Sequence, residues 1–343
     1  MTQIVYQLAD LTALRDRDSL DSALMSTLHE LLHPETLSIF RLVGPANNER
    51  WLNCAHMQDG IEQLRTRQDW AELEELPRAC DVVERQQALQ NNQIVISEAT
   101  PMGYVFPLSS GGARNGVLEI VCRVSISKET ITLVSAVLRL YQNFHGLLDY
   151  GERDALTELL NRKTFDESFL KATAPSSDAK ELATDDRRHQ HGGASYWLAM
   201  LDIDHFKRVN DNFGHLIGDE VLLLLARLMR DTFRFHDLLY RFGGEEFVVL
   251  LSCTQGSQAE AAFERLRRDT EKHSFPQVGR ITISVGFTEV RNGDSPSGAF
   301  ERADKAVYYA KEHGRNQVFG YESLVAQGHL AAAKLSAGEI ELF

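Results

Sequence analysis

The second half of the chain alternates helix-type and strand-type sequence, and this order constrains the fold more than any other feature. Apolar residues at a helical period indicate helices at 164–171, 220–234, 258–273 and 299–311, and strand-type runs lie at 196–203, 238–251 and 281–288. Segments in this order bury their apolar surfaces by packing helices on a sheet. The sequence therefore predicts an α/β unit in which helices cover a sheet.

The first part of the chain predicts a smaller α+β unit. Helical periods indicate helices at 19–32 and roughly 77–89. Short strand-type runs lie at 37–43, 51–57, 94–97, 104–108 and 116–122, with turn signals at Asn47-Asn48 and Gly111-Gly112. Two domains agree with the length of 343 residues.

A helix expected over residues 127–153 joins the two parts and carries two apolar stripes. One stripe consists of Ile131, Val134, Leu138, Tyr141 and Leu148. The other consists of Leu133, Val137, Leu140, Phe144 and Leu147. Such a helix can pack on its own domain and on a partner helix at once. Two interpretations follow: a connector that makes a homodimer, or a helix that simply closes the first domain.

The composition is that of a globular protein, with 43% hydrophobic and 25% charged residues. No apolar run approaches the ~18–20 residues of a membrane span, and the first twenty residues lack the pattern of a signal peptide. The four cysteines lie far apart without a C-x-x-C pair, which argues against a zinc site or a disulfide framework. We expect a cytoplasmic protein.

The net charge of −13 includes no basic half, so nucleic acid is not an expected partner. An acidic chain that handles a polyanion needs local basic residues or metal ions held by carboxylates. The polar stretch 172–195 is expected to be a surface insertion, in which His189 and His191 are solvated rather than metal-binding.

A strand-type run over 197–204 ends with Asp202 and Asp204, which a period of two places on one face. Carboxylates at the end of a buried strand cost free energy unless a cation compensates them. A divalent metal would do so, and the plainer alternative is a strand that ends in solvent.

The run 238–251 predicts a hairpin with Gly243 and Gly244 at its turn. Paired glycines permit positive φ and let a ligand approach bare backbone. Glu245 and Glu246 then follow in an otherwise apolar strand, where neighbours face opposite sides. This acidic turn beside Asp202 would form a carboxylate cluster able to hold Mg²⁺ on the phosphates of a nucleotide.

The sequence Gly-Gly-Glu-Glu-Phe at 243–247 resembles the signature of the GGDEF family of diguanylate cyclases, in its common Glu variant. Three further segments resemble motifs of that family: 154–162, 201–219 and 303–316. The motifs follow the family order across residues 154–319. The departures are the insertion at 172–195 and Val307 where leucine is usual, and neither touches the expected site.

The resemblance implies a palm-like domain that binds one GTP. Two such domains would face each other and join two GTP into cyclic di-GMP, releasing two pyrophosphates with Mg²⁺ or Mn²⁺. The implied catalytic residues are Asp202, Glu245 and Glu246, which with the backbone carbonyl of Ile203 also hold the metal. The implied GTP-binding residues are Phe206, Lys207, Asn210, Asp219, Gly243, Gly244, Lys311 and Arg315. Asn210 and Asp219 would read guanine, and the cations would neutralise phosphates.

The family also has an inhibitory product site, formed by an R-x-x-D pair five residues before the Gly-Gly turn. Arg234 and Asp237 match this spacing, and Arg265 on the next expected helix could add a contact. A guanidinium suits both a phosphate and the O6/N7 edge of guanine. The plainer reading is a surface ion pair.

The first part resembles a GAF-type sensory domain in element order and length, with a PAS-like unit as the rival. The expected organisation is a GAF-like domain at 1–126, a helical connector at 127–153, a GGDEF domain at 154–322 and a tail at 323–343. The function implied is a diguanylate cyclase regulated by its sensor and by its product. The alternative is a catalytically silent receptor of GTP or cyclic di-GMP, although such members usually lose the acidic turn.

Overall fold

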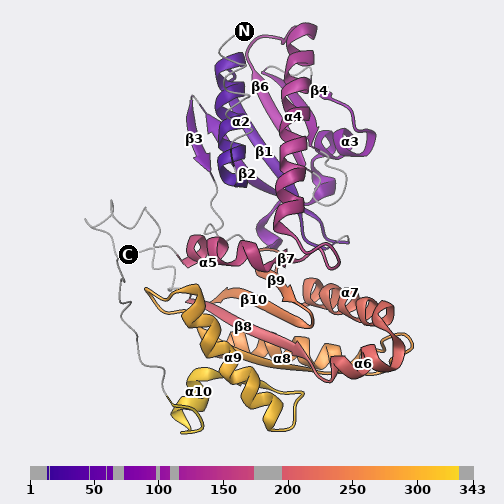
Figure 1. Ribbon diagram of the computed structural model, residues 1–343. Coiled ribbons are helices and arrows are strands. Elements are labelled where there is room, and N and C mark those ends of the chain that lie inside the picture. Colours follow the sequence, from indigo (N-terminus) through magenta and orange to yellow (C-terminus); the bar gives the residue numbers. More distant parts are fainter. Residues whose placement is uncertain are drawn as a thin grey trace, which may run out of the picture. The chain divides into compact units, whose positions relative to one another are not determined.

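The computed structural model describes residues 14, 16–45, 47–58, 60–64, 73–97, 101–108, 116–173 and 195–331. The chain divides into two units, residues 1–151 and 152–343 (Figure 1). The expected boundary at 153/154 lies close to this division. The turn at Gly111-Gly112, His189, His191 and most of the 172–195 stretch lie outside the described residues.

A six-stranded sheet forms the centre of the N-terminal unit, and all its neighbouring strands are antiparallel. Its order is β3-β2-β1-β6-β5-β4. The strands are β1 (Thr36–Val43), β2 (Arg50–Gln58), β3 (Ile61–Leu64), β4 (Val95–Ser97), β5 (Met102–Leu108) and β6 (Gly116–Cys122). The sequence predicted all of these except β3, which adds a short edge strand beside β2.

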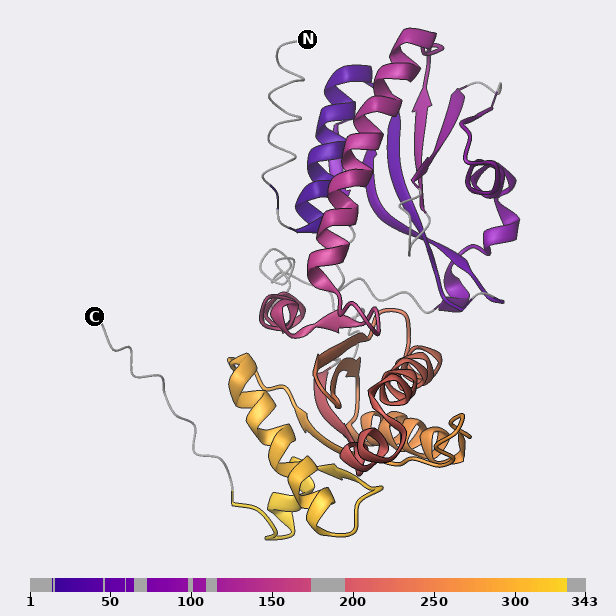
Figure 2. The same ribbon diagram turned by 45° about the vertical axis from the view of Figure 1, so that its right-hand side comes forward.

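Helices cover both faces of this sheet. Helix α2 (Arg17–Leu32) and helix α4 (Lys128–Glu152) lie side by side on one face, where they share a core with the sheet (Figure 2). Helix α3 (Val83–Asn91) packs on the other face around Trp51. Helix α2 begins where the Asp16 side chain accepts a hydrogen bond from the backbone N–H of Ser19, 3.0 Å away.

The helix expected at 77–89 begins later, at Val83. The backbone before it is used elsewhere, because the carbonyl of Pro77 accepts from the N–H of Trp51 and the N–H of Ala79 donates to the carbonyl of Glu49. These bonds hold residues 77–79 against the start of β2. A helix that began there would give them up.

Helix α4 confirms the expected long helix, and one of its sides closes the core of the N-terminal unit. Val134, Val137 and Tyr141 are buried there, whereas Leu133 and Leu147 are 37% and 65% exposed. The buried side of α4 therefore does not coincide with either predicted stripe, because Val137, predicted to lie with Leu133 and Leu147, is buried with Val134 and Tyr141. An apolar strip on α4 stays at the surface of this unit.

The C-terminal unit has a mixed six-stranded sheet in the order β12-β11-β8-β10-β9-β7. Its strands are β7 (Leu160–Asn161), β8 (Ser195–Ile203), β9 (Leu238–Gly243), β10 (Glu246–Cys253), β11 (Ile283–Glu289) and β12 (Val318–Gly320). The two edge pairs, β7 with β9 and β11 with β12, are parallel, and the other pairs are antiparallel.

Helices cover both faces of the second sheet, as the alternation predicted (Figure 1). One face packs on α6 (Phe206–Phe213), α7 (His215–Thr232) and α8 (Gly256–Lys272). The other packs on α5 (Phe165–Thr173) and α9 (Pro296–Glu312). The sequence did not predict four short elements: β7, α6, β12 and helix α10 (Tyr321–Ala326).

Helix α9 approaches β11 closely because Gly286 has no side chain. A Cβ at Gly286 would collide with the backbone of α9 at Ala303 and Val307. This close packing brings the C-terminal end of α9 to the strand ends that carry the candidate site. Among the described residues, no helix has the length and apolar character needed to cross a membrane.

Candidate active site

Asp202 lies at the C-terminal end of β8, where the strand register surrounds it with polar residues. It stands opposite Glu246 of β10 and opposite Ser284 of β11. Alternate residues of β8 face α9, and Asp202 continues that face. The Lys311 ammonium at the end of α9 lies 2.7 Å from Oδ2 of Asp202. The structure thus joins two residues that the sequence placed in one site.

The site contains an excess of negative charge. Burial raises the pKa of Asp202, while Lys311 and Arg315 lower it and Asp204 raises it further. Burial also raises the pKa of Glu245, and the charges of Asp202 and Glu246 add to this. These carboxylates are therefore close enough to repel one another, and added positive charge would stabilise all of them.

The hairpin turn differs from its prediction in one respect. Strand β9 runs through Gly243, β10 begins at Glu246, and these two residues pair, so the turn itself is formed by Gly244 and Glu245. Glu245 therefore lies in the turn and not in the strand. The reason is an irregularity of register between Glu246 and Phe247, which local alternation does not reveal.

Both glycines are needed at this turn. Gly243 has φ 147° and Gly244 has φ 53°, and a Cβ at either position would meet no atom within 4 Å. Backbone conformation, and not crowding within the protein, therefore demands glycine here. The open space above the turn leaves its backbone accessible to a ligand.

Arg241 holds the turn in place, a role that was missed in the sequence. Its Nε and Nη2 donate to the carbonyl of Gly244 at 3.2 and 3.0 Å, and its Nη1 donates to Asp154 Oδ1 at 3.0 Å. Asp154 also accepts from the backbone and hydroxyl of Thr157. The first family-like motif thus supports the turn. The one feature of the sequence that could have indicated this role is the position of Arg241, two residues before Gly243.

The donor set fits a hard divalent cation that a nucleotide helps to bind. Among the residues that the structure describes, no three His, Cys, Asp or Glu side chains form a complete metal site. The carboxylates of Asp202 and Glu245 carry oxygen atoms of the kind such a cation takes as ligands, and burial, followed by neighbouring carboxylates, raises the pKa of both. Mg²⁺ is commonly held by one or two carboxylates, water and substrate phosphates. Ile203, the expected carbonyl ligand, is fully buried beside Asp202.

The residues expected to bind GTP come from four elements. Phe206, Lys207 and Asn210 lie on α6, and Phe206 is buried while Lys207 is exposed. Asp219 lies on α7, which packs against α6. A Cβ at Gly218 would collide with Oδ1 of Asn210, so Asn210 lies directly beside the residue that precedes Asp219. The structure thereby brings Asn210 next to the turn of α7 that carries Asp219.

Arg234 and Asp237 form a compact turn before β9. The Asp237 carboxylate accepts from the backbone N–H of Arg234 at 2.8 Å. Burial raises the pKa of Asp237 to about 6, although the nearby charges of Arg234 and Arg265 lower it. Arg265 on α8 donates to the carbonyl of Thr232 at 2.8 Å. The structure therefore groups the three residues predicted to form the product site.

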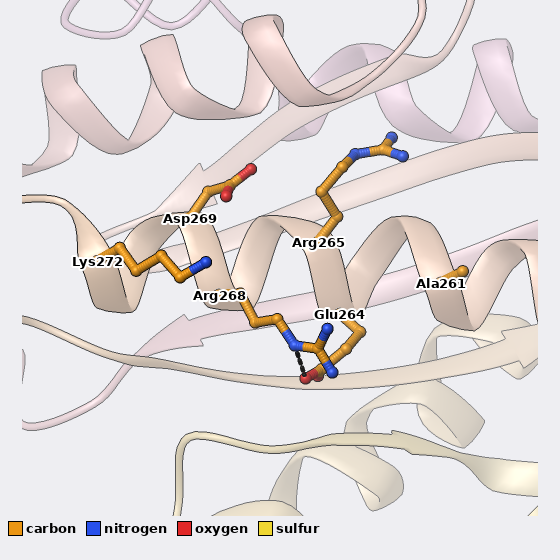
Figure 3. Close-up of a pocket in the computed structure, with 6 residues that line it drawn as sticks. All are labelled: Ala261, Glu264, Arg265, Arg268, Asp269 and Lys272. Atoms are coloured by element: carbon orange, nitrogen blue, oxygen red, sulfur yellow. Dashed lines mark hydrogen bonds and ion pairs between the residues drawn. The ribbon is translucent and has the colours of Figure 1, made fainter.

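Arg265 also lines a groove of about 390 Å³ along α8 (Figure 3). The lining residues are Ala261, Glu264, Arg265, Arg268, Asp269 and Lys272. In Figure 3, Arg265 and Asp269 point to one side of the helix, and Glu264 and Arg268 point to the other. Three of the six lining residues are cationic.

Comparison with known proteins agrees with these features. Residues 152–317 match the family model described as "Diguanylate cyclase, GGDEF domain". The chain is 41% identical to the diguanylate cyclase DgcP of Pseudomonas aeruginosa over 182 residues, which cover 51% of this chain and 25% of that protein. It is 33% identical to the diguanylate cyclase DgcM of Escherichia coli K12 over 223 residues, covering 64% and 50%.

A solved structure is also similar to part of this chain. It contains the coiled coil and GGDEF domain of DgcB from Caulobacter crescentus in complex with c-di-GMP, with 30% identity and a TM-score of 0.47. The match covers 56% of this chain and 97% of that one. The chain spans a quarter to a half of the length of the curated relatives DgcP and DgcM.

Proposed function

Because residues 152–317 belong to the GGDEF family of diguanylate cyclases, we propose that this chain condenses two GTP into cyclic di-GMP and releases two pyrophosphates. One observation carries the proposal. Asp202 lies opposite Glu246, directly after the Gly244–Glu245 turn, with Lys311 2.7 Å away. In-line attack on an α-phosphate needs positioning and charge neutralisation more than covalent help from the protein.

The acidic residues would hold a divalent cation, Mg²⁺ or Mn²⁺, when GTP is bound. Its ligands would be Asp202, Glu245 and the carbonyl of Ile203, with Glu246 assisting at the metal or at the attacking 3′-hydroxyl. Bound there, the cation would supply charge neutralisation at the phosphates. Burial raises the pKa of Glu245, and the charges of Asp202 and Glu246 raise it further. A cation would relieve this repulsion, which supports the assignment.

The remaining residues would bind the nucleotide itself. Asn210 and Asp219 would complement the donor and acceptor groups of guanine from α6 and α7. Lys207, Lys311 and Arg315 would neutralise the phosphates, together with backbone amides near Phe206. The open space above Gly243 and Gly244 would let the phosphates approach the turn.

Incubation of the purified chain with GTP and Mg²⁺, followed by chromatography, tests the activity. We expect cyclic di-GMP and pyrophosphate in a 1:2 ratio, and no comparable conversion of ATP, because the wrong base leaves polar groups unpaired. The alternative, a silent receptor, predicts GTP or cyclic di-GMP binding without turnover. Comparable conversion of ATP and GTP would contradict the roles of Asn210 and Asp219.

We also propose that the protein acts as a homodimer through α4. One site binds one GTP, so turnover requires two domains to meet. Val134, Leu138 and Tyr141 are buried in the N-terminal unit, so changing them would damage its core. The exposed Leu133 and Leu147 lie fourteen residues apart, a spacing of two heptads, and offer a better test.

Glutamate at both positions, Leu133→Glu with Leu147→Glu, should shift the protein to monomers and lower its activity at dilute concentration. Val83→Glu is the matched control, because Val83 is 53% exposed on α3 of the same unit. Sedimentation velocity measures the mass. A double variant that stays dimeric and fully active would leave α4 as a helix that only closes its own domain.

A product site at Arg234, Asp237 and Arg265 is the third part of the proposal. Arg291 and Asp294 provide a matched control, because the backbone N–H of Arg291 donates to Asp294 at 2.7 Å in the same way. Arg234→Ala should prevent the slowing of progress curves as cyclic di-GMP accumulates, whereas Arg291→Ala should not. Equal inhibition of wild type and Arg234→Ala would reduce the pair to a turn-forming contact.

We propose a GAF-like sensory role for the N-terminal unit, supported by its antiparallel sheet between α2 and α4 on one face and α3 on the other. Trp51 is buried under α3, so its fluorescence should report a small molecule bound on that face. A ligand that changes this signal and also changes cyclase activity would support the role. A ligand that still changes the fluorescence of the Trp51→Phe variant would oppose it, because another tryptophan would then report the ligand.

A further inference from the structure

The loop after α9 carries Arg315 in a backbone conformation that side chains rarely adopt. Gly314, Arg315 and Asn316 have φ values of 112°, 64° and 50° in succession. The N–H of Arg315 donates to the carbonyl of Ala310 at 2.9 Å, which closes the end of the helix. Because non-glycine residues disfavour positive φ, contacts from outside the loop must hold this conformation.

Those contacts converge on Asn316. Its backbone N–H donates to Asp204 Oδ2 at 3.0 Å, and its side-chain amide N–H donates to Glu271 Oε1 at 2.8 Å. Its side-chain oxygen accepts from Nη1 of Arg267 at 2.6 Å. The backbone donor and both ends of the amide are thus bound by three different side chains.

The Asp204 side chain that bonds the loop is itself held by two further hydrogen bonds. Asp204 is 6% exposed, and its carboxylate accepts from the hydroxyls of Thr282 and Ser284, both at 2.7 Å. It lies two residues after Asp202, directly beyond β8. From the sequence, Asp204 was expected only to share a face with Asp202 and to need a compensating cation. The structure turns Asp204 to the Asn316 loop, whereas Lys311 contacts Asp202.

Arg267 supplies the other anchor from the middle of α8. Its side chain is 12% exposed, and it donates twice to Glu264, at 2.8 Å each, and once to Glu271 at 2.9 Å. These bonds fix the planar guanidinium so that its remaining donor direction meets Asn316. A lysine could not satisfy this set of acceptors in one plane.

We propose that Asp204, Asn316 and Arg267 form a clamp that holds Arg315 where the phosphates of GTP bind, which makes Arg267 a positioning residue. The inference rests on the proposed function. The loop borders the carboxylates, because the N–H of Arg315 donates to the carbonyl of Ala310, the residue before Lys311, whose ammonium lies 2.7 Å from Asp202. Arg267 contacts the loop through Asn316 and acts on the substrate only through it.

Binding measurements on the full chain test the clamp. The ligands are a GTP analogue with a methylene bridge between the α- and β-phosphates, and GMP, which lacks the outer phosphates. Arg267→Met should weaken the analogue about tenfold, a loss of about 1.4 kcal/mol, and GMP less than about twofold. Arg268→Met is the control, because Arg268 also bonds Glu264 (Figure 3) and its side chain is 61% exposed. It should leave both affinities within about twofold.

A second variant separates positioning from loss of fold. Asn316→Gly keeps the backbone N–H and tolerates positive φ while it removes both amide contacts, so we expect the same selective loss. In an Arg315→Ala background, Arg267→Met should cause no further loss, because it acts through Arg315.

Three results would overturn the clamp. They are unchanged analogue affinity in Arg267→Met and Asn316→Gly, equal losses for the analogue and GMP, and additive losses in the double variant. If the wild-type chain binds no GTP analogue at all, the proposed function itself fails. If Arg315→Ala alone weakens the analogue, the proposed function survives a failure of the clamp.

Discussion

In the N-terminal unit the buried Asp21 carboxylate is neutralised inside its own domain, whereas in the C-terminal unit Asp202 shares a strand end with Glu245 and Glu246. Arg41 donates to both oxygens of Asp21, at 2.9 and 2.7 Å, and the hydroxyl of Tyr141 donates to the same carboxylate. Asp202 has Lys311, but burial still raises its pKa.

The charges around Asp21 join elements of one unit, whereas the carboxylates around Asp202 are left with a negative excess. The Asp21 cluster links α2, β1 and α4. Burial lowers the pKa of Arg41, but Asp21, Tyr141 and Cys54 together outweigh this and raise it overall. At the candidate active site, the two cations Lys311 and Arg315 lie near three carboxylates, those of Asp202, Glu245 and Glu246. The pKa values of Asp202 and Glu245 are raised, so ionisation of these two groups opposes folding.

The largest expected effect tests the acidic side of this comparison. Asp202→Asn or Glu245→Gln should lower the rate of cyclic di-GMP synthesis about a thousandfold or more, through lost charge stabilisation. Because burial and repulsion raise both pKa values, the neutral amides should not lower the melting temperature at pH 8. Residual activity near wild type, or an unfolded variant, would contradict this reading.

The opposite result is expected at the neutralised cluster. Asp21→Asn should destabilise the N-terminal unit by about 3–5 kcal/mol, because it leaves the Arg41 charge buried without a counter-charge. Asp21→Asn with Arg41→Met should recover part of this loss. Hydrogen exchange of the β1 amides measures it within that unit. A loss below about 1 kcal/mol would mean that the cluster contributes no more than a surface pair.

A smaller effect is expected at Arg241, whose charge holds the turn beside the carboxylates but does not contact them. Arg241→Met removes the link between Gly244 and Asp154 and should lower kcat about 10- to 100-fold by displacing Glu245. Arg162→Met is the control, since that guanidinium lies 5.7 Å over the ring of Phe242 in the same strand. Equal rates for wild type and Arg241→Met would show that the turn holds its shape unaided.

The smallest effect concerns Asp237, a buried carboxyl in the C-terminal unit outside the active site. Its pKa is about 6, above its ordinary value of 3.8, so the folded state binds the proton more tightly than the unfolded state. The contribution of Asp237 should therefore favour folding below about pH 4 and be lost as the pH rises to about 6.

Asp237→Asn should remove this dependence and stabilise the unit by about 1–2 kcal/mol above pH 6, compared with wild type. Urea unfolding between pH 4 and pH 8, followed by the fluorescence of Trp197, measures the difference. A parallel pH dependence in wild type and variant would assign the slope to another group.

The local sequence predicted the elements with strong periodicity, including α2, α4, β8 and α9, almost to their ends. It predicted less well where backbone groups are used at a distance, as at residues 77–82, or where a short element depends on its neighbours, as in β3 and α6. Periodicity reports which face of a segment is buried. It does not report which segment provides the burial.

The same division holds within the active site. The motifs determined which residue types are present: Asp202, the two glycines, the two glutamates and Lys311. Only the tertiary structure decided that Glu245 lies in the turn, that Arg241 reaches Asp154 across 87 residues, and that Asp204 bonds Asn316 across 112. Turn chemistry and strand alternation are local and can be read from neighbouring residues. Contacts between distant side chains depend on sheet order and register, which the packing of the whole unit fixes.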